Sequence, residues 1–396
     1  MWIRKRIDIS WRDLSRAAVY CLMARRADVE QTRVEALWSE SALACLSVRS
    51  GWDLLLQATA FPPGSEVLVS ALTIPDMVRI IEDHGLVPVP LDVETETALP
   101  SPETIEAGVT PNTRAVLLAH LFGATAPLDR HVAVARRHGL LFVEDCAQAF
   151  RGLGDAGHPQ ADASLVSFGF IKTATALGGA VTIVRRPDLL NEMRRRQHEY
   201  PIQPKREHLR RGLHCAVLKL LSSRIGARSL LTLLRICGRN VDRFLNSRTR
   251  GFPRHRMFEM IRRRPSTPLL RLLRRRIEAF DIDAQQAREQ RGRRLVRQLE
   301  PVAACPAADV EQHAFWVIPV LVEDPEELRR KLLAAGFDTT QADSMCVVQP
   351  PCPSGTASPE NARRMLDQAV FLPFYEALPI RELDRMARII TPGKPG

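Results

Sequence analysis

The chain has 396 residues, of which 45% are hydrophobic, 26% are charged and only 6% are aromatic. This length and composition exclude a fibrous or disordered protein and allow two or three domains with sizeable hydrophobic cores. The formal net charge is +11, and because no run of about 18 uncharged apolar residues occurs, we expect no membrane-spanning helix.

The first two hundred residues predict an α/β domain. Residues 1–48 show mixed helical patterns, and short apolar runs then alternate with helical patterns as far as residue 190. The apolar runs are residues 66–70, 86–90, 115–119, 140–143, 163–168 and 180–184. Short apolar strands separated by helices are typical of a mostly parallel sheet with helices on both faces. The chain does not open on the apolar segment of a signal peptide, so we expect a cytoplasmic protein.

The remainder predicts helices followed by a smaller α+β domain. Residues 201–276 are rich in arginine and leucine and indicate helical hairpins, and residues 282–299 indicate one long polar helix. From residue 314 the pattern is a strand, a helix over 325–335, a proline-rich loop over 350–359, a strand and a helix. We predict three parts, which are an N-terminal segment with the large domain (1–200), a basic helical insertion (201–261), and connecting helices with a small C-terminal domain (262–396).

Two charged residues follow predicted strands of the same sheet. Asp145 comes directly after the run 140–143, and Lys172 follows the run 163–168 among apolar, small and hydroxyl residues. Ligands bind at the carboxyl ends of strands in open α/β sheets, and an apolar setting lowers a lysine pKa and favours the nucleophilic free amine. Taken alone, Asp145 equally suits a turn cap, and Lys172 equally suits a strand-end lysine reaching for solvent.

Neighbouring residues are suited to a phosphate group. The hydroxyl of Ser167 precedes Lys172, and the small-residue turn 49–53 opens a helical run whose first amides are free for an anion or for an ordinary cap. A phosphate cradle, an aspartate for a pyridinium nitrogen and a Schiff-base lysine are together what pyridoxal phosphate (PLP) requires. A GxGxxG match at 152–157 opens no helix, so we expect no dinucleotide site there.

Several stretches resemble the DegT/StrS-type sugar aminotransferases, which are fold type I PLP enzymes. They are VEDCAQAF (143–150), SFGFIKTATALGGA (167–180), PPGSEVLVSALTIPDM (62–77), HLFG (120–123) and FLPFYEALPIRELDRM (371–386). The resemblance covers roughly residues 34–200 and 262–396. It implies the fold type I architecture with a mostly parallel central sheet, and a homodimer with no metal.

The resemblance also implies roles for individual residues. Lys172 would form the Schiff base with the cofactor, and Asp145 would pair with its pyridine nitrogen. The other cofactor-binding positions are Gln148 against the ring or its 3′-oxygen, Ser167 and the backbone at Gly51 and Trp52 on the phosphate, and Ile74 beside the ring. His120 matches a strand-end histidine of the family, for which we have no physical role.

Lysine at position 172 favours transamination, because family members that dehydrate their substrates have histidine there. The expected reaction moves an amino group from an amino acid donor to a keto group, by family default on a nucleotide-linked sugar in polysaccharide or secondary-metabolite biosynthesis. Lys172 would act as general base and then as general acid.

Three positions depart from the family pattern. Ile74 stands where an aromatic residue usually stacks on the cofactor, and Thr173 replaces a common asparagine. Residues 262–266 (RRRPS) replace a loop that reaches the phosphate of the neighbouring subunit, and an arginine there would suit a phosphate.

The net positive charge is concentrated in one segment. Residues 205–276 hold 21 Lys and Arg against 3 Asp and Glu, so the rest of the chain carries a net negative charge. Leucines and arginines over residues 210–245 suit a helix on an anionic membrane surface and a lipid-linked acceptor. The alternatives are an insertion packed on its own enzyme, with solvated arginines, and a surface for a partner protein. Without a reader motif we expect no nucleic-acid binding.

Two other functions remain open on sequence grounds. A PLP-binding regulatory protein of the same fold would suit the missing aromatic at Ile74. A different PLP reaction, such as decarboxylation or desulfuration, is the other, and a desulfurase would need a nucleophilic Cys346 or Cys352. The eight cysteines include no CxxC pair and no zinc spacing, which favours buried thiols in a reducing compartment.

Overall fold

The computed structural model describes residues 1–4, 6–23, 26–154, 156–221, 252–341, 344–351 and 358–391. Most of the predicted membrane-contact region, 210–245, therefore lies outside the described residues. Within the described ranges, no helix is both long enough and apolar enough to cross a bilayer.

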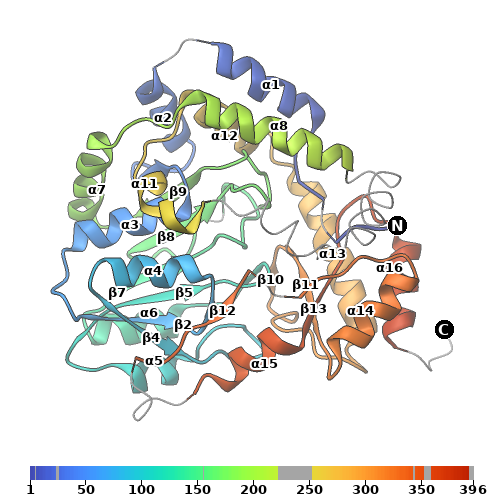
Figure 1. Cartoon of the computed structure of the whole chain (residues 1–396). Helices are drawn as coiled ribbons and strands as arrows, with labels where there is room; N and C mark the ends of the chain where they lie inside the picture. The colour runs from blue at the N-terminus through green and yellow to red at the C-terminus, as the bar shows by residue number, and fades with distance from the viewer. Residues whose placement is uncertain are drawn as a thin grey trace.

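A seven-stranded sheet forms the centre of the large domain (Figure 1). In spatial order its strands are β1 (Ala42–Cys45), β9 (Ala180–Val184), β8 (Ala163–Ser167), β7 (Leu141–Asp145), β5 (Thr113–Ala119), β2 (Glu66–Ser70) and β4 (Val87–Leu91). The strands from β8 to β4 are parallel, whereas β9 is antiparallel to both of its neighbours. This confirms the predicted mostly parallel sheet.

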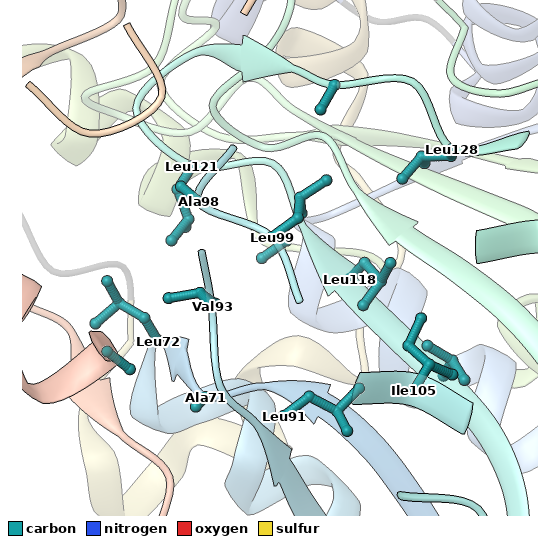
Figure 2. Packing of buried hydrophobic residues seen from close by; sticks show 14 of the residues in the cluster. Ala71, Leu72, Leu91, Val93, Ala98, Leu99, Ile105, Leu118, Leu121 and Leu128 are labelled. Carbon is teal, nitrogen blue, oxygen red and sulfur yellow. The ribbon is translucent and has the colours of Figure 1, made fainter. Parts of the chain in front are cut away.

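The sheet alternates its side chains between two hydrophobic cores, as the two-residue period of a strand requires. On β2, Val67 and Val69 pack with α3 (Val48–Thr59), α4 (Pro75–Asp83) and α7 (Pro187–Glu199), while Leu68 points to the opposite face. That second face is covered by α5 (Pro102–Gly108) and α6 (Asp129–Arg137). Figure 2 shows this second core, in which Leu118 of β5 and Ile105 of α5 pack together.

Residues 1–48 are only partly helical. They form α1 (Trp11–Leu22) and α2 (Ala27–Glu35), but residues 42–45 form the edge strand β1 rather than the expected helix. A four-residue apolar run is too short for periodicity to separate strand from helix, and the pairing with β9 decides it. The helical pattern predicted for 201–276 appears as α8 (Lys205–Leu221), a 3₁₀ turn (Arg254–Arg256), α11 (Met257–Ile261) and α12 (Thr267–Glu278). Figure 1 shows α1, α2, α8 and α12 together at one end of the molecule.

The C-terminal part begins with the predicted polar helix, α13 (Ile282–Leu299). The elements that follow it are β10 (Gln312–His313), β11 (Ile318–Leu321), α14 (Pro325–Ala334), β12 (Cys346–Val347), α15 (Glu360–Gln368), β13 (Ala369–Leu372) and α16 (Ile380–Ile390). Two short antiparallel ladders connect this part to the large domain, β10 with β6 (Ala124–Thr125) and β12 with β3 (Leu72–Thr73). They hold the loop between β10 and β11 against the edge of the central sheet. The boundaries at residues 200 and 261 remain a prediction.

Candidate active site

Asp145 and Lys172 lie at the same edge of the sheet. Asp145 is the last residue of β7, and Lys172 belongs to the loop that leaves the carboxyl end of the neighbouring parallel strand β8. Since β1 is antiparallel to β9, the carboxyl end of β1 also reaches this edge, and α3 begins there. The topology therefore gathers a carboxylate, an amine and a helix N-terminus at the place where open α/β sheets bind ligands.

The two charged groups shift each other's pKa. Burial lowers the pKa of Lys172 to about 8, with Asp145 opposing this shift and the positive charge of Arg49 adding to it. Burial raises the pKa of Asp145, and the opposing influences are the amide of Ala147, at 2.9 Å from Oδ1, and the charges of Lys172, His120 and Arg49. About half of the Lys172 amines would be neutral at pH 8, as a nucleophile or proton acceptor requires.

Trp316, from the loop between β10 and β11, lies against the amine of Lys172. The Nζ atom of Lys172 is 4.1 Å from the centroid of the Trp316 ring. The indole N–H of Trp316 donates a hydrogen bond of 3.2 Å to the carbonyl oxygen of Ile171, the residue before the lysine. No sequence motif predicts this contact, because it joins two parts of the chain that no local pattern connects.

The first turn of α3 was predicted to meet a phosphate through Gly51 and Trp52. In the structure Ser47 caps the helix, and the amide of Gly51 donates to the carbonyl oxygen of Ser47 at 3.1 Å. A Cβ atom at Gly51 would lie 2.2 Å from Oγ1 of Thr182, so the glycine allows α3 to pack closely on β9. Trp52 is fully buried in the core. The amides of Val48 and Arg49 come before the first intrahelical donor, which is the amide of Gly51, and they point out of the helix.

Arg49 also lies at this site, although the sequence alone indicated only that it belongs to a turn. Its Nε donates to Oδ2 of Asp76 at 2.5 Å, and its guanidinium carbon lies 5.9 Å from the centroid of the Phe252 ring. Asp76 is its one hydrogen-bond partner in the described part of the chain, so both Nη groups are available for a second acceptor. The positive charge of Arg49 lowers the pKa of both Asp145 and Lys172.

The three arginines of the 262–266 loop have acidic partners within this chain. Arg262 contacts Asp53 and Asp83, each at 2.9 Å. Arg263 pairs with Glu207 at 2.8 Å and with Glu259 at 2.9 Å, and Arg264 pairs with Asp28. Their charges are therefore compensated away from Lys172.

Ser167, Gln148 and Ile74 lie at or just after the carboxyl ends of β8, β7 and β3. Ser167 is buried at the end of β8, where its Oγ accepts from the amide of Gly169 at 3.3 Å. Gln148 is partly buried, and its Oε1 accepts from the amide of Phe122 at 2.9 Å. Ile74 precedes α4 and packs partly buried against the core. A small pocket beneath α4 is lined by Asp145, Ser70, Thr73 and Val78 among others.

His120, Glu144 and Cys146 form a buried group next to Asp145 whose atoms are close enough to share a metal ion. Nε2 of His120 lies 3.2 Å from Oε2 of Glu144. The other oxygen of Glu144 accepts from the hydroxyl of Ser164 at 2.7 Å and from the amide of His158 at 2.5 Å. These hydrogen bonds satisfy the carboxylate of Glu144 within the protein. We therefore interpret the His120–Glu144 pair as a structural contact that stabilises the ends of β5 and β7.

Cys346 is a weak candidate for a nucleophile. It lies in β12 opposite Thr73, and burial together with the charge of Asp76 raises the pKa of its thiol to about 11. A thiol that remains protonated at neutral pH is a poor nucleophile, which argues against desulfuration through Cys346. Cys352 lies outside the described residues.

The residues at this edge fit PLP chemically. A carboxylate on β7 suits a protonated ring nitrogen, and a lysine with a lowered pKa suits an aldehyde carbon. The outward amides at the start of α3 and the free Nη groups of Arg49 suit a dianionic phosphate.

Comparison with known proteins agrees with this chemistry. The model of the DegT/DnrJ/EryC1/StrS aminotransferase family matches residues 22–215. Among solved structures, the sugar aminotransferase CalS13 from Micromonospora echinospora is 19% identical, with all of both chains covered and a TM-score of 0.67. NtdA from Bacillus subtilis, with bound cofactor PMP, is 17% identical over 99% of this chain and 85% of its own, with a TM-score of 0.70.

A third similar structure is PseC from Helicobacter pylori, an aminotransferase involved in the biosynthesis of pseudoaminic acid. It is 12% identical over 98% of both chains, with a TM-score of 0.68. At these identities the structures show the fold, which is that of fold type I PLP enzymes. The match of the family model, joined to the lysine and aspartate at the carboxyl edge of the sheet, shows that this chain belongs to the DegT/DnrJ/EryC1/StrS aminotransferase family.

Proposed function

We propose that this PLP-dependent aminotransferase transfers an amino group from an amino acid to the keto group of a nucleotide-linked sugar. The observation that carries the proposal is the pair of Asp145 and Lys172 at the carboxyl edge of the sheet, with the pKa of the lysine lowered to about 8. The sugar substrate is supported by similar structures such as CalS13, a sugar aminotransferase.

The chain's own residues divide the chemical work. Bound at this edge, PLP supplies an aldehyde carbon and an electron-accepting ring. Lys172 would hold the cofactor through its Nζ atom at that carbon, and once displaced it would take a proton from the substrate carbon and deliver it to the cofactor carbon. The carboxylate of Asp145 would hold the proton on the ring nitrogen, and Gln148 and Ile74 would contact the ring. These roles are part of the proposal.

We assign the phosphate to Ser167, the first turn of α3 and Arg49. The outward amides of the helix and the guanidinium would each donate to phosphate oxygens. Gly51 and Trp52 support this turn through packing, since the glycine allows close contact with β9 and the tryptophan is buried beneath it.

The absorbance spectrum of the purified protein and its lysine variants test the proposal. The wild type should show a visible band that an amino donor removes, and borohydride should fix the cofactor to Lys172. Lys172→Ala should lose the covalent attachment and the response to donor, because within the described ranges Lys172 is the lysine that acts on Asp145. Lys219→Ala is the matched control, since Lys219 is a partly buried lysine of α8 whose amine lies over the ring of Trp11 and donates to the carbonyl of Ile9.

A wild type without a visible band would refute the cofactor assignment. A band that persists with every amino donor would instead favour the alternative, a PLP-binding regulatory protein of the same fold.

We further propose a homodimer, on the resemblance to enzymes that bind the cofactor at a subunit interface. Light scattering on the holoenzyme should then give twice the mass of the chain, which is 44.4 kDa. A mass near 44 kDa across the concentration range would contradict this assembly.

Membrane contact near α8 is a third part of the proposal. Leu213, Val217 and Leu220 follow one face of α8 and are 61%, 53% and 61% exposed. This apolar stripe, together with the arginines of residues 210–245, favours contact with a membrane surface or a lipid-linked molecule. Co-sedimentation with anionic and neutral liposomes tests this proposal. If the protein sediments with neither kind of liposome, the proposal is wrong.

A further inference from the structure

The contact between Trp316 and Lys172 crosses the two parts of the molecule. The lysine amine faces the indole ring at 4.1 Å, and the indole N–H is tied to the backbone beside the lysine, at the carbonyl of Ile171. One side chain therefore holds both the reacting nitrogen and the loop that carries it.

Arg288 of α13 fixes the loop that presents Trp316. Its guanidinium donates to the carbonyl oxygen of Phe315 at 2.6 and 2.9 Å and to those of Ala314 and Trp316 at 3.3 Å. The same group bonds the carbonyl of Phe374 at 3.2 Å and lies 4.8 Å from its ring centroid. A buried guanidinium spread over four carbonyls leaves the loop one well-defined conformation.

The contacts of Phe315 also restrict the conformation of this loop. Its φ of 44° is in the left-handed region, and its ring stacks on His313 at a centroid distance of 3.9 Å. The amide of Phe315 donates to Nδ1 of His313 at 2.8 Å. Gly292 of α13 makes room for the ring, because a Cβ there would lie 2.4 Å from it. A non-glycine residue held in this conformation by its surroundings is typical of a functional site.

The charged groups that act on Lys172 are Asp145, from β7, and Arg49, from α3. Asp145 favours the charged amine, and Arg49 disfavours it. A ring face carries partial negative charge, so Trp316 acts on the same side as Asp145, from the opposite part of the molecule.

We propose that Trp316 is a positioning residue for Lys172, holding the amine under its ring and favouring the charged form of the nitrogen. It supplies the aromatic contact that Ile74 does not, but to the reacting nitrogen and from the C-terminal part of the chain. The inference rests on the role proposed above for Lys172.

The test is a pH titration of the visible band of the holoenzyme. In Trp316→Leu the nitrogen keeps an apolar cover but loses the ring face, so the midpoint should fall by about 0.5 to 1.5 pH units. Trp316→Phe keeps a weaker ring face and should fall by less. Trp11→Leu is the matched control, and no change in the midpoint is expected. It removes another lysine–tryptophan contact, in which Nζ of Lys219 lies 5.9 Å from the centroid of the Trp11 ring.

The direction of the shift separates this role from simple shielding. A ring that only excludes water would, on removal, raise the midpoint, because a better solvated nitrogen is more readily charged. An unchanged or raised midpoint in Trp316→Leu therefore overturns the inference, and if that variant does not fold, an unchanged or raised midpoint in Trp316→Phe does so. Absence of any visible band in the wild type would instead refute the proposed function.

Discussion

Replacing Arg49 with glutamine should weaken the binding of PLP mainly through its phosphate. The guanidinium stands in the first turn of α3 and donates only to Asp76 within the described part of the chain, which leaves its Nη groups free for the phosphate. A hydrogen bond to a charged group contributes about 1.5 to 3 kcal/mol, so the Kd for PLP should rise about 10- to 150-fold. Glutamine keeps a neutral donor, which places the expected loss toward the lower figure.

Titration of the apo protein with PLP and with pyridoxal measures this effect. Pyridoxal lacks the phosphate, so Arg49→Gln should change its Kd much less than the Kd for PLP, and only through the charge that Arg49 exerts on Lys172 and Asp145. Arg79→Gln is the control, because Arg79 is a partly exposed arginine on α4 that donates to the carbonyl of Arg254. An equal loss for both ligands would place Arg49 at the ring rather than the phosphate, and no loss for either would refute the assignment.

Two further predictions concern packing and chemistry. Gly51→Ala should lower the free energy of unfolding by about 1 to 3 kcal/mol in denaturant titration, since its Cβ would lie 2.2 Å from Thr182, whereas Gly154→Ala meets open space and should be near neutral. Cys346→Ser should retain transamination at the wild-type rate in a coupled assay, because a thiol with a pKa of about 11 is protonated at neutral pH and is a poor nucleophile. A large loss of activity would support the alternative hypothesis of a desulfurase.

The sequence was sufficient for features that depend on local patterns and on one topological rule. Apolar runs located β2 and β9 to the residue and the other predicted strands to within a few residues. Once two parallel neighbours were expected, Asp145 and Lys172 had to share an edge, because both follow carboxyl ends. Strand β1 was missed, although it brings the start of α3 to that edge, since four apolar residues carry no period of their own.

Contacts between distant segments were beyond the sequence for a different reason. The arginines at 262–264 looked suitable for a phosphate, but the identity of their acidic partners depends on how α2, α3 and α8 pack around them. Arg49, by contrast, looked like one residue of a turn. Which arginine remains available for a ligand is a property of the assembled charges, and no local pattern reports it.

The Asp145–Lys172 pair and the contact of Trp316 with Lys172 depend on different parts of the fold. The edge of the sheet is fixed by strand order, so Asp145 and Lys172 are carried by the most rigid part of the fold. Trp316 reaches Lys172 only because short ladders such as β10 with β6 hold the C-terminal part over that edge. The relative position of the two parts therefore sets the environment of the reacting nitrogen.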